Sequence, residues 1–297
     1  MVKTSNLIQN LRSGLLTPEE ALKQFELPAT HISEIDMNKL EIKVTPSGFK
    51  SLDEYFLLKD GQSELIIFGA RPGMGKSSFM FQLAANVAKH SNVLGLSLEM
   101  DVDSIKGRLA SVVSGIRLSQ FQRGSVAADT LRKINTELSG LNLYLKDRDV
   151  RRIGDIHDTI LAVHKVKPLS LVVVDYLQLI KTPEKGTRDA EIGNITSELK
   201  AIAKEIKCPI IVGSQLNRAC ENRGRDSGDY SPQLSDLRES GNIEQDADIV
   251  MFLSRPSVYE DTRPGEADII IAKNRNGKTG RILMRFSQEQ TRFYEYE

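Results

Sequence analysis

The sequence contains no tryptophan, only two cysteines and no long apolar run. Cys208 and Cys220 have no second cysteine pair beside them, so neither a zinc site of paired cysteines nor a disulfide scaffold is expected. No apolar run approaches the ~20 residues of a membrane span, and the N-terminal stretch lacks the apolar core of a signal peptide. These absences predict a cytoplasmic protein with no membrane association.

The chain also lacks a surplus of charge of either sign. Its 40 basic and 40 acidic side chains cancel over 297 residues. No global positive field therefore attracts a polyanion, and any nucleic-acid binding must come from a local patch or from assembly.

Apolar segments typical of strands alternate with helical patterns along most of the chain. Such alternation, with nearly continuous Val, Ile and Leu in the strands, predicts an α/β fold with a mostly parallel central sheet covered by helices on both faces. The expected strands are Leu65–Phe68, Val93–Leu98, Leu141–Leu145, Leu169–Val174, Pro209–Gly213 and Ile249–Leu253, and the clearest helices are Ser78–Lys89, Ile153–Lys165 and Ala190–Ile206.

The two ends of the chain differ from this central pattern. Close-spaced strands at Ala267–Ala272, Arg281–Phe286 and Thr291–Tyr296, with a turn at Asn276-Gly277, predict antiparallel strands at the C-terminus. Residues 1–27 carry two short amphipathic helical patterns and too few apolar residues for a core of their own, which predicts a helical arm within residues 1–44. Residues 218–229, rich in charge and glycine, predict a mobile loop.

The segment Leu65–Ser78, LIIFGARPGMGKSS, reads as an apolar strand, a glycine-rich turn and the start of a helix. This order is typical of a phosphate-binding loop that holds a nucleoside triphosphate, although Ala70 stands where the usual pattern has glycine. We expect Lys76 to reach the β and γ phosphates and Ser77 to hold Mg²⁺. The nucleotide-binding residues predicted from this loop are Arg71, Pro72, Gly73, Met74, Gly75, Lys76, Ser77 and Ser78.

Polar side chains follow three of the predicted strands, at the sheet edge where ligands bind in this class of fold. Asp175 ends an apolar strand and is expected to complete the Mg²⁺ site. Glu99 could polarise the attacking water, or it could be a solvated acid at a strand end. Gln215 could sense the γ-phosphate and signal to the next loop, or it could belong to an ordinary polar loop.

Taken together, these motifs resemble the C-terminal motor domain of DnaB-type replicative helicases, a hexameric branch of the RecA-like ATPases. The resemblance covers about residues 45–297, which become the motor domain, and leaves residues 1–44 as arm and linker. It is carried by ARPGMGKSS, SLEM ending at Met100, VVVDYLQLI, GSQLNR, SDLRESGNIEQDAD from Ser235 to Asp248, and IAKNRNGKTG from Ile271 to Gly280.

The resemblance implies roles for further residues. Glu99 would be the catalytic base and Gln215 the γ-phosphate sensor, with ATP and Mg²⁺ bound at Lys76, Ser77 and Asp175. Lys273 and Arg275 would enter the ATP site of the neighbouring subunit, where an arginine stabilises charge on the transferred phosphoryl group. Without the resemblance, the latter two residues would read equally well as a solvated hairpin turn.

The resemblance also implies contacts with single-stranded DNA. Arg238, Glu239 and Gly241 match a loop that lines the central channel and touches the phosphate backbone, so binding should be salt-dependent and tolerant of sequence. Aromatic residues make up only 6% of the chain, so base stacking is not the expected mode. Lys185 and Arg188, in the segment after the Asp175 strand, are candidates for a second DNA-contacting loop.

The function implied is an ATP-driven ring motor, a homohexamer that moves 5′ to 3′ on single-stranded DNA and unwinds it. Two other functions fit the residues: a RecA-like ATPase that remodels DNA without unwinding, and a nucleotide-gated hexameric scaffold. Full-length family members carry a globular N-terminal domain that binds primase, whereas only residues 1–44 precede the motor here. Binding of a loader or primase is therefore an open expectation.

Overall fold

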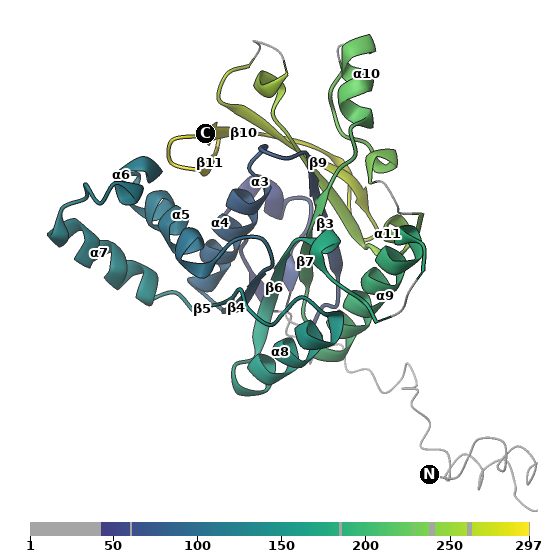
Figure 1. Ribbon diagram of the computed structural model, residues 1–297, viewed down its shortest axis with the longest axis horizontal. Helices are drawn as coiled ribbons and strands as arrows, with labels where there is room; N and C mark the ends of the chain where they lie inside the picture. Colours follow the sequence, from purple (N-terminus) through teal and green to yellow (C-terminus); the bar gives the residue numbers. More distant parts are fainter. Residues whose placement is uncertain are drawn as a thin grey trace, which may run out of the picture. The chain divides into compact units, whose positions relative to one another are not determined.

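The computed structural model of the protein describes residues 43–59, 61–183, 186–227, 229–237, 241–259 and 263–296 (Figure 1). Nearly all of the predicted arm, residues 1–44, lies outside these ranges, and its division from the motor domain stays a prediction. Arg238, Glu239 and Lys185 lie outside them as well. Among the described residues, no helix combines the length and apolarity that crossing a bilayer requires.

Nine strands of the described chain form one sheet, in the order β11-β10-β9-β8-β3-β7-β6-β4-β5. The six strands from β8 to β5 are parallel, and β9, β10 and β11 continue the sheet in antiparallel fashion. Both features confirm the predicted α/β class. The strands are β3 Leu65–Ala70, β4 Asn92–Ser97, β5 Leu143–Lys146, β6 Leu169–Asp175, β7 Ile210–Gln215, β8 Ile249–Ser254, β9 Glu266–Asn274, β10 Gly280–Ser287 and β11 Arg292–Glu295.

The helices cover both faces of the parallel strands, as the buried strand residues require. They are α3 Lys50–Asp53, α4 Lys76–Ala88, α5 Val102–Ser114, α6 Leu118–Gln122, α7 Ala128–Ser139, α8 Ile153–Val166, α9 Arg188–Ile206, α10 Ala219–Ser227 and α11 Gly241–Asp246. Single 3₁₀ turns occur at η3 Leu177–Leu179, η4 Leu234–Asp236 and η5 Pro256–Val258, and β1 Val44–Thr45 pairs with β2 Leu58–Lys59.

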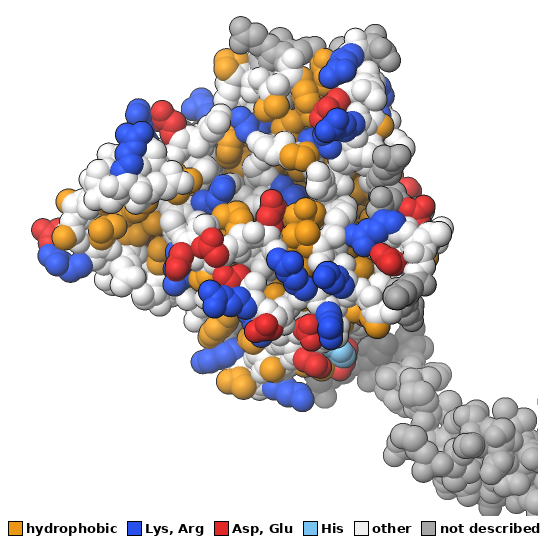
Figure 2. Space-filling model, viewed as in Figure 1, with side chains coloured by type: hydrophobic (Ala, Val, Ile, Leu, Met, Phe, Trp, Pro, Cys, Tyr) orange, Lys and Arg blue, Asp and Glu red, His pale blue; other side chains and the backbone are white. Residues whose placement is uncertain are grey.

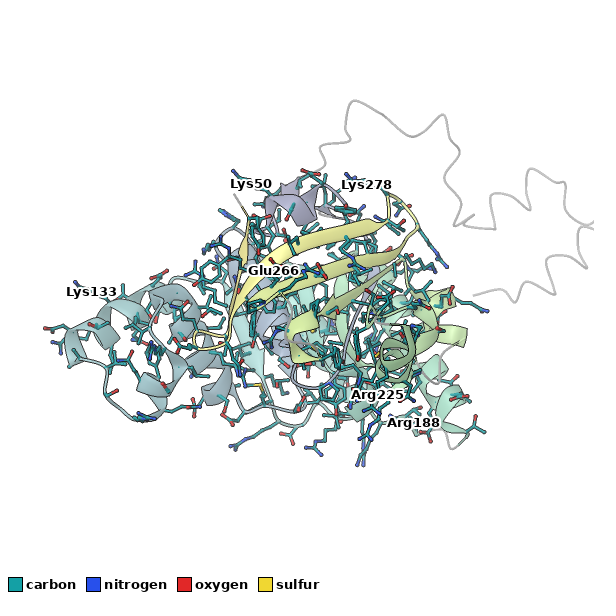
Figure 3. The ribbon with its side chains drawn as sticks, turned by 90° about the horizontal axis from the view of Figure 1, so that it is seen from above. Lys50, Lys133, Arg188, Arg225, Glu266 and Lys278 are labelled. Atoms are coloured by element: carbon teal, nitrogen blue, oxygen red, sulfur yellow. The ribbon has the colours of Figure 1, made fainter. Side chains whose placement is uncertain are left out.

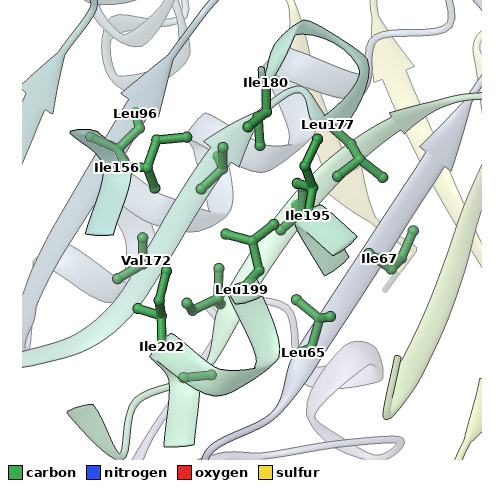
Figure 4. Packing of buried hydrophobic residues seen from close by; sticks show 14 of the residues in the cluster. Leu65, Ile67, Leu96, Ile156, Val172, Leu177, Ile180, Ile195, Leu199 and Ile202 are labelled. Carbon is green, nitrogen blue, oxygen red and sulfur yellow. The ribbon is translucent and has the colours of Figure 1, made fainter. Parts of the chain in front are cut away.

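Alternate residues of each strand belong to two different cores. Leu65, Ile67 and Val172 face α8, α9 and α11, and Figure 4 shows them opposite Ile195, Leu199 and Ile202 of α9. The intervening residues, such as Ile66 and Phe68, pack against α4 and the β10–β11 hairpin. This division follows from the two-residue period of a strand. The parallel pairing of β7 with β3 and with β6 brings the carboxyl ends of these three strands side by side.

Helices α5, α6 and α7 lie to one side of the sheet, at the left of Figure 1, and our sequence analysis did not predict them. The N-cap Asp101 accepts a hydrogen bond from Ser104 N at 2.7 Å, and Gly115 ends α5 with φ +70°. Ile134 is the one buried residue of α7. Figure 2 shows hydrophobic side chains gathered over this part of the molecule.

One sequence prediction is wrong. Residues 218–229 do not form a loop throughout, because α10 occupies Ala219–Ser227. Ion pairs that short-range sequence patterns cannot reveal hold this helix, since Glu221 contacts Arg71 and Arg223 contacts the buried Asp236.

Candidate functional site

The loop between β3 and α4 has the backbone of a phosphate cradle. Gly73 and Gly75 adopt φ values of +77° and +101°, a region that favours glycine, and α4 begins at Lys76. Between them, Met74 is buried in the core. Ala70 still belongs to β3, so this position needs no glycine. The first turn of α4 presents N–H groups that no intrahelical carbonyl satisfies, which is the usual setting for a bound anion.

Lys76 and Asp175 meet at the base of the site. Lys76 Nζ donates to Asp175 Oδ1 at 2.5 Å, and the carboxylate is fully buried. A Cβ at Gly213, on the neighbouring strand β7, would lie 2.7 Å from Lys76 Nζ and 2.9 Å from Asp175 Oδ1. Glycine is therefore needed at position 213 to leave room for this ion pair.

The second oxygen of Asp175 has no hydrogen-bond partner among the described residues, although it is buried. A buried carboxylate oxygen without a partner is costly and calls for an explanation. Mg²⁺ prefers carboxylate and hydroxyl oxygens, and Ser77, which lines the cavity, follows directly after Lys76, the partner of Asp175. The donor set of Ser77 and Asp175 fits the predicted metal ion.

Tyr176 lies beside this pair. Lys76 Nζ is 4.3 Å from the centroid of its ring, a cation–π distance. Burial raises the pKa of the Tyr176 hydroxyl, and the nearby charges of Glu99 and Asp175 raise it further. Tyr176 therefore remains a neutral phenol that can donate a hydrogen bond within the site.

A cavity of about 420 Å³ opens above the loop, a size that suits a nucleotide. Glu99 and Gln215 both line it, and both are exposed. Gln178 holds the Gln215 backbone, because its Oε1 accepts from Gln215 N at 3.1 Å while its Nε2 donates to Gln215 O at 3.2 Å. Seven of the eight residues predicted from the loop line the cavity, and Met74 does not.

Other cavity residues were missed by the sequence analysis. Arg108, on α5, donates to Ser78 Oγ at 3.2 Å, and Arg255 donates to Gly73 O at 3.3 Å. Arg255 stacks on Phe286, and burial lowers the pKa of its guanidinium. Arg255 could have been found, because it follows the predicted strand 249–253 at the ligand-binding edge. Arg108 has no comparable signal. Further lining residues are Met100, Gln288 and Thr291.

Lys273 and Arg275 lie away from this cavity, at the opposite end of the strands, where the parallel strands begin. Lys273 pairs with Val250, at the start of β8, whereas Arg255 follows its end, roughly 16 Å further along the strand. Lys273 Nζ donates to Ala247 O at 2.8 Å and also to Glu244 O. Figure 3 shows the two ends of this part of the sheet: Lys278 marks the β9–β10 turn near Lys273 and Arg275, and Glu266 marks the start of β9 at the other end.

Of the predicted DNA contacts, the structure describes Gly241 and Arg188. Gly241 begins α11, whose Asp246 accepts from Thr196 Oγ1 of α9 at 2.9 Å. Arg188 begins α9 and donates to Gln178 O at 2.7 Å, so it is held near η3, the turn that follows β6 and Asp175. The arrangement as a whole provides phosphate-loop donors, a buried lysine–carboxylate pair and an exposed acid, which are the parts that phosphoryl transfer to water requires.

The family model for the DnaB-like helicase C-terminal domain matches residues 45–295. The chain belongs to this family. It is 39% identical over 284 residues to the replicative DNA helicase DnaB of Buchnera aphidicola subsp. Baizongia pistaciae, covering 92% of this chain and 58% of the relative. It is 36% identical over 268 residues to the replicative DNA helicase DnaB of Geobacillus stearothermophilus, covering 86% and 58%. The chain thus spans under two thirds of these relatives.

Solved structures agree with this assignment. One solved ATPase domain superposes with a TM-score of 0.78 at 29% identity, covering 97% of this chain and 99% of that one. A DnaB-like replicative helicase, described with its interactions with primase, superposes at 0.79 and 29% identity, covering 99% and 74%. The predicted RecA-like fold of this DnaB-like domain is confirmed.

Proposed function

We propose that the protein is the motor of an ATP-dependent replicative DNA helicase, which hydrolyses ATP in a ring and moves 5′ to 3′ on single-stranded DNA. The observation that carries the proposal is the Lys76–Asp175 pair at the base of a nucleotide-sized cavity, in a chain of the DnaB-like helicase family. A motor that acts on replicating DNA in this way belongs in the cytoplasm.

Each group at the site has a task in ATP hydrolysis. The phosphate loop and Lys76 orient the triphosphate, while Ser77 and Asp175 hold Mg²⁺, which neutralises charge that develops on the phosphates. Glu99 accepts a proton from the attacking water, since it is an exposed carboxylate at the cavity wall. Gln215 reports the γ-phosphate through the strand end that Gln178 fixes.

Arginine and lysine from a second subunit complete the site. Lys273 and Arg275 lie far from the cavity of their own chain, so any role of theirs in hydrolysis is at the ATP site of a neighbour. Burial and the adjacent Arg275 lower the pKa of Lys273. Hydrolysis then depends on assembly, and a homohexameric ring satisfies this dependence with every site at an interface.

In such a ring, Arg238, Glu239 and Gly241 line the channel and follow the DNA backbone, and Lys185 with Arg188 forms a second contact. A primase or a loader is a further partner, since one superposing helicase is described with primase. The relatives are named as helicases, which favours unwinding over DNA remodelling alone and over a scaffold.

The test is steady-state ATP hydrolysis with and without single-stranded DNA, over a range of protein concentrations, with Lys76→Ala as the blank. The proposal expects a rate that rises with DNA and steeply with concentration, and opening of a forked duplex. Hydrolysis without fork opening would favour the remodelling ATPase, whereas a slow rate that ignores both DNA and concentration would favour the scaffold.

A further inference from the structure

The ion pair between Arg71 and Glu221 joins the phosphate loop to α10. Arg71 Nε donates to Glu221 Oε1 at 2.6 Å, and a second guanidinium nitrogen donates to Leu216 O at 2.7 Å. Both side chains are largely shielded, with 11% and 23% of their surface exposed. Because Arg71 also lines the nucleotide cavity, one side chain contacts both the ligand site and the segment that follows β7.

A second ion pair joins α10 to the segment that precedes the predicted DNA loop. Arg223 donates to both carboxylate oxygens of Asp236, at 3.2 and 2.8 Å, and Asp236 is fully buried. Asn217 N donates to Asp236 O at 3.0 Å, so the exit of β7 and η4 are also joined directly. A two-pronged, charge-assisted contact of this kind fixes orientation as well as distance.

These contacts make residues 215–227 and 229–237 a connected unit with the phosphate loop at one end and Asp236 at the other. Glu221 and Arg223 stand only two residues apart on α10, next to Cys220, whose thiol has a pKa raised by burial. A helix, and not an irregular loop, therefore links Glu221 to Arg223 and through it to Asp236.

We infer that the Arg71–Glu221 pair is a positioning contact through which nucleotide binding sets the place of α10 and Asp236, and with them the affinity for DNA. This inference rests on the proposed function. The physical cause is competition: the phosphates of a bound triphosphate attract the Arg71 guanidinium away from Glu221, whereas ADP lacks the γ-phosphate charge. A ligand shifts a structure only through such a difference in contacts between two states.

The experiment measures how strongly nucleotide changes the affinity for labelled single-stranded DNA, by fluorescence anisotropy of the full chain. The Kd is determined with a non-hydrolysable ATP analogue and with ADP, and the ratio of the two values is compared between variants. Glu221→Gln removes the charge and keeps the side-chain shape. Glu205→Gln is the matched control, because Glu205 is also a helical glutamate in an ion pair. It lies exposed on α9 and pairs with His157 of α8 at 2.8 Å.

We expect a ratio of at least about fivefold for the unsubstituted chain and for Glu205→Gln, in the usual range of coupling between sites. Glu221→Gln should bring the ratio to within about twofold of 1, and Glu221→Asp should restore part of it. DNA-free ATP hydrolysis of Glu221→Gln should change less than about twofold, since Glu221 does not line the cavity.

Two results would overturn the inference and leave the proposed function intact. One is an unchanged ratio in Glu221→Gln. The other is an equal loss of DNA affinity with both nucleotides, which would mean that the ion pair only supports the structure. An unsubstituted chain whose DNA affinity ignores nucleotide would instead contradict the proposed function itself. Should Glu221→Gln fail to fold, Glu221→Ala, which also removes the charge, replaces it with the same expected ratio.

Discussion

Two lysine–aspartate pairs lie at opposite ends of the strands of the same sheet, and they differ in the hydrogen bonds that the two carboxylate oxygens accept. At the strand starts, Asp248 Oδ2 accepts from Lys200 Nζ and from Leu65 N at 2.8 Å, and Asp248 Oδ1 accepts from Arg275 at 3.3 Å. At the carboxyl edge, Asp175 Oδ1 accepts from Lys76, while Asp175 Oδ2 has no partner among the described residues.

We infer that the difference separates a structural pair from a functional one. Lys200 and Asp248 tie α9 to the first residue of β3 and leave neither oxygen of Asp248 unused, so their contribution is to stability. Asp175 carries the cost of an unpaired buried oxygen, and a ligand that binds there recovers this cost. Buried ion pairs alone do not mark active sites; here the pair with an unsatisfied carboxylate oxygen is the one that lies beside the nucleotide-sized cavity.

The largest expected effect on ATP hydrolysis concerns Arg275, which pairs with Asp248 at the same end of the sheet as Lys200. If it acts on a neighbouring subunit, Arg275→Ala should lower ATP hydrolysis about 10³-fold. Mixing this variant with Lys76→Ala should restore part of the activity, because some interfaces then combine an intact Lys76 with an intact Arg275. The measurement is the hydrolysis rate of each variant and of the mixture.

Arg281→Ala is the matched control for this experiment. Arg281 and Arg275 are similarly exposed, at 50% and 48%, and each pairs with an aspartate, Asp268 or Asp248. The control should retain full activity. Full activity of Arg275→Ala, or a mixture no more active than its components, would contradict a role in the neighbouring site.

Asp175→Asn tests the functional pair directly. An amide keeps the size of the side chain but loses the anionic oxygen, so we expect hydrolysis to fall at least about 10²-fold. The melting temperature of the ligand-free protein should stay within a few degrees, because the amide oxygen can still accept the hydrogen bond from Lys76 and a costly buried charge is removed. Near-normal hydrolysis at saturating Mg²⁺ would contradict the proposed metal site.

Gly213→Ala tests the space around the same pair. Its Cβ would push Lys76 Nζ or Asp175 from their positions, and we expect hydrolysis to fall roughly tenfold, since small misplacements at a reacting centre are costly. Gly95→Ala on β4 is the control, because a Cβ there would meet the side chains of Leu145 and Phe81 instead. Gly95→Ala should lower stability and spare the rate per folded molecule; equal rates in both variants would refute the steric argument.

Sequence reasoning succeeded where a local pattern determines the structure. Continuous apolar runs predicted the parallel strands. The glycine-rich stretch before Lys76, set between an apolar run and a helical pattern, predicted the strand–turn–helix that the structure has there. The confirmed antiparallel C-terminus followed from close-spaced strands with an Asn276-Gly277 turn. These signals are short-range, so one sequence contains them in full.

Features that depend on distant contacts were out of reach. The helix α10 looked like a loop because its anchors, Arg71 and Asp236, belong to other segments. Arg108 enters the cavity from a helix that no motif marks, and the unsatisfied oxygen of Asp175 becomes visible only once β6 and β7 lie side by side. Such features arise from packing between segments that are far apart in the sequence.

Lys200→Met should have the smallest effect on catalysis, and it tests the comparison between the two lysine–aspartate pairs most directly. Lys200 also donates to Ser63 O at 2.7 Å, and with its side chain only 16% exposed its loss should lower the free energy of unfolding by about 2 kcal/mol. Urea denaturation measures this change. Hydrolysis per folded molecule should stay within about twofold, whereas Lys76→Met at the other edge should abolish it. If the two methionine variants lost activity equally, an unsatisfied oxygen would not distinguish the functional pair from the structural one.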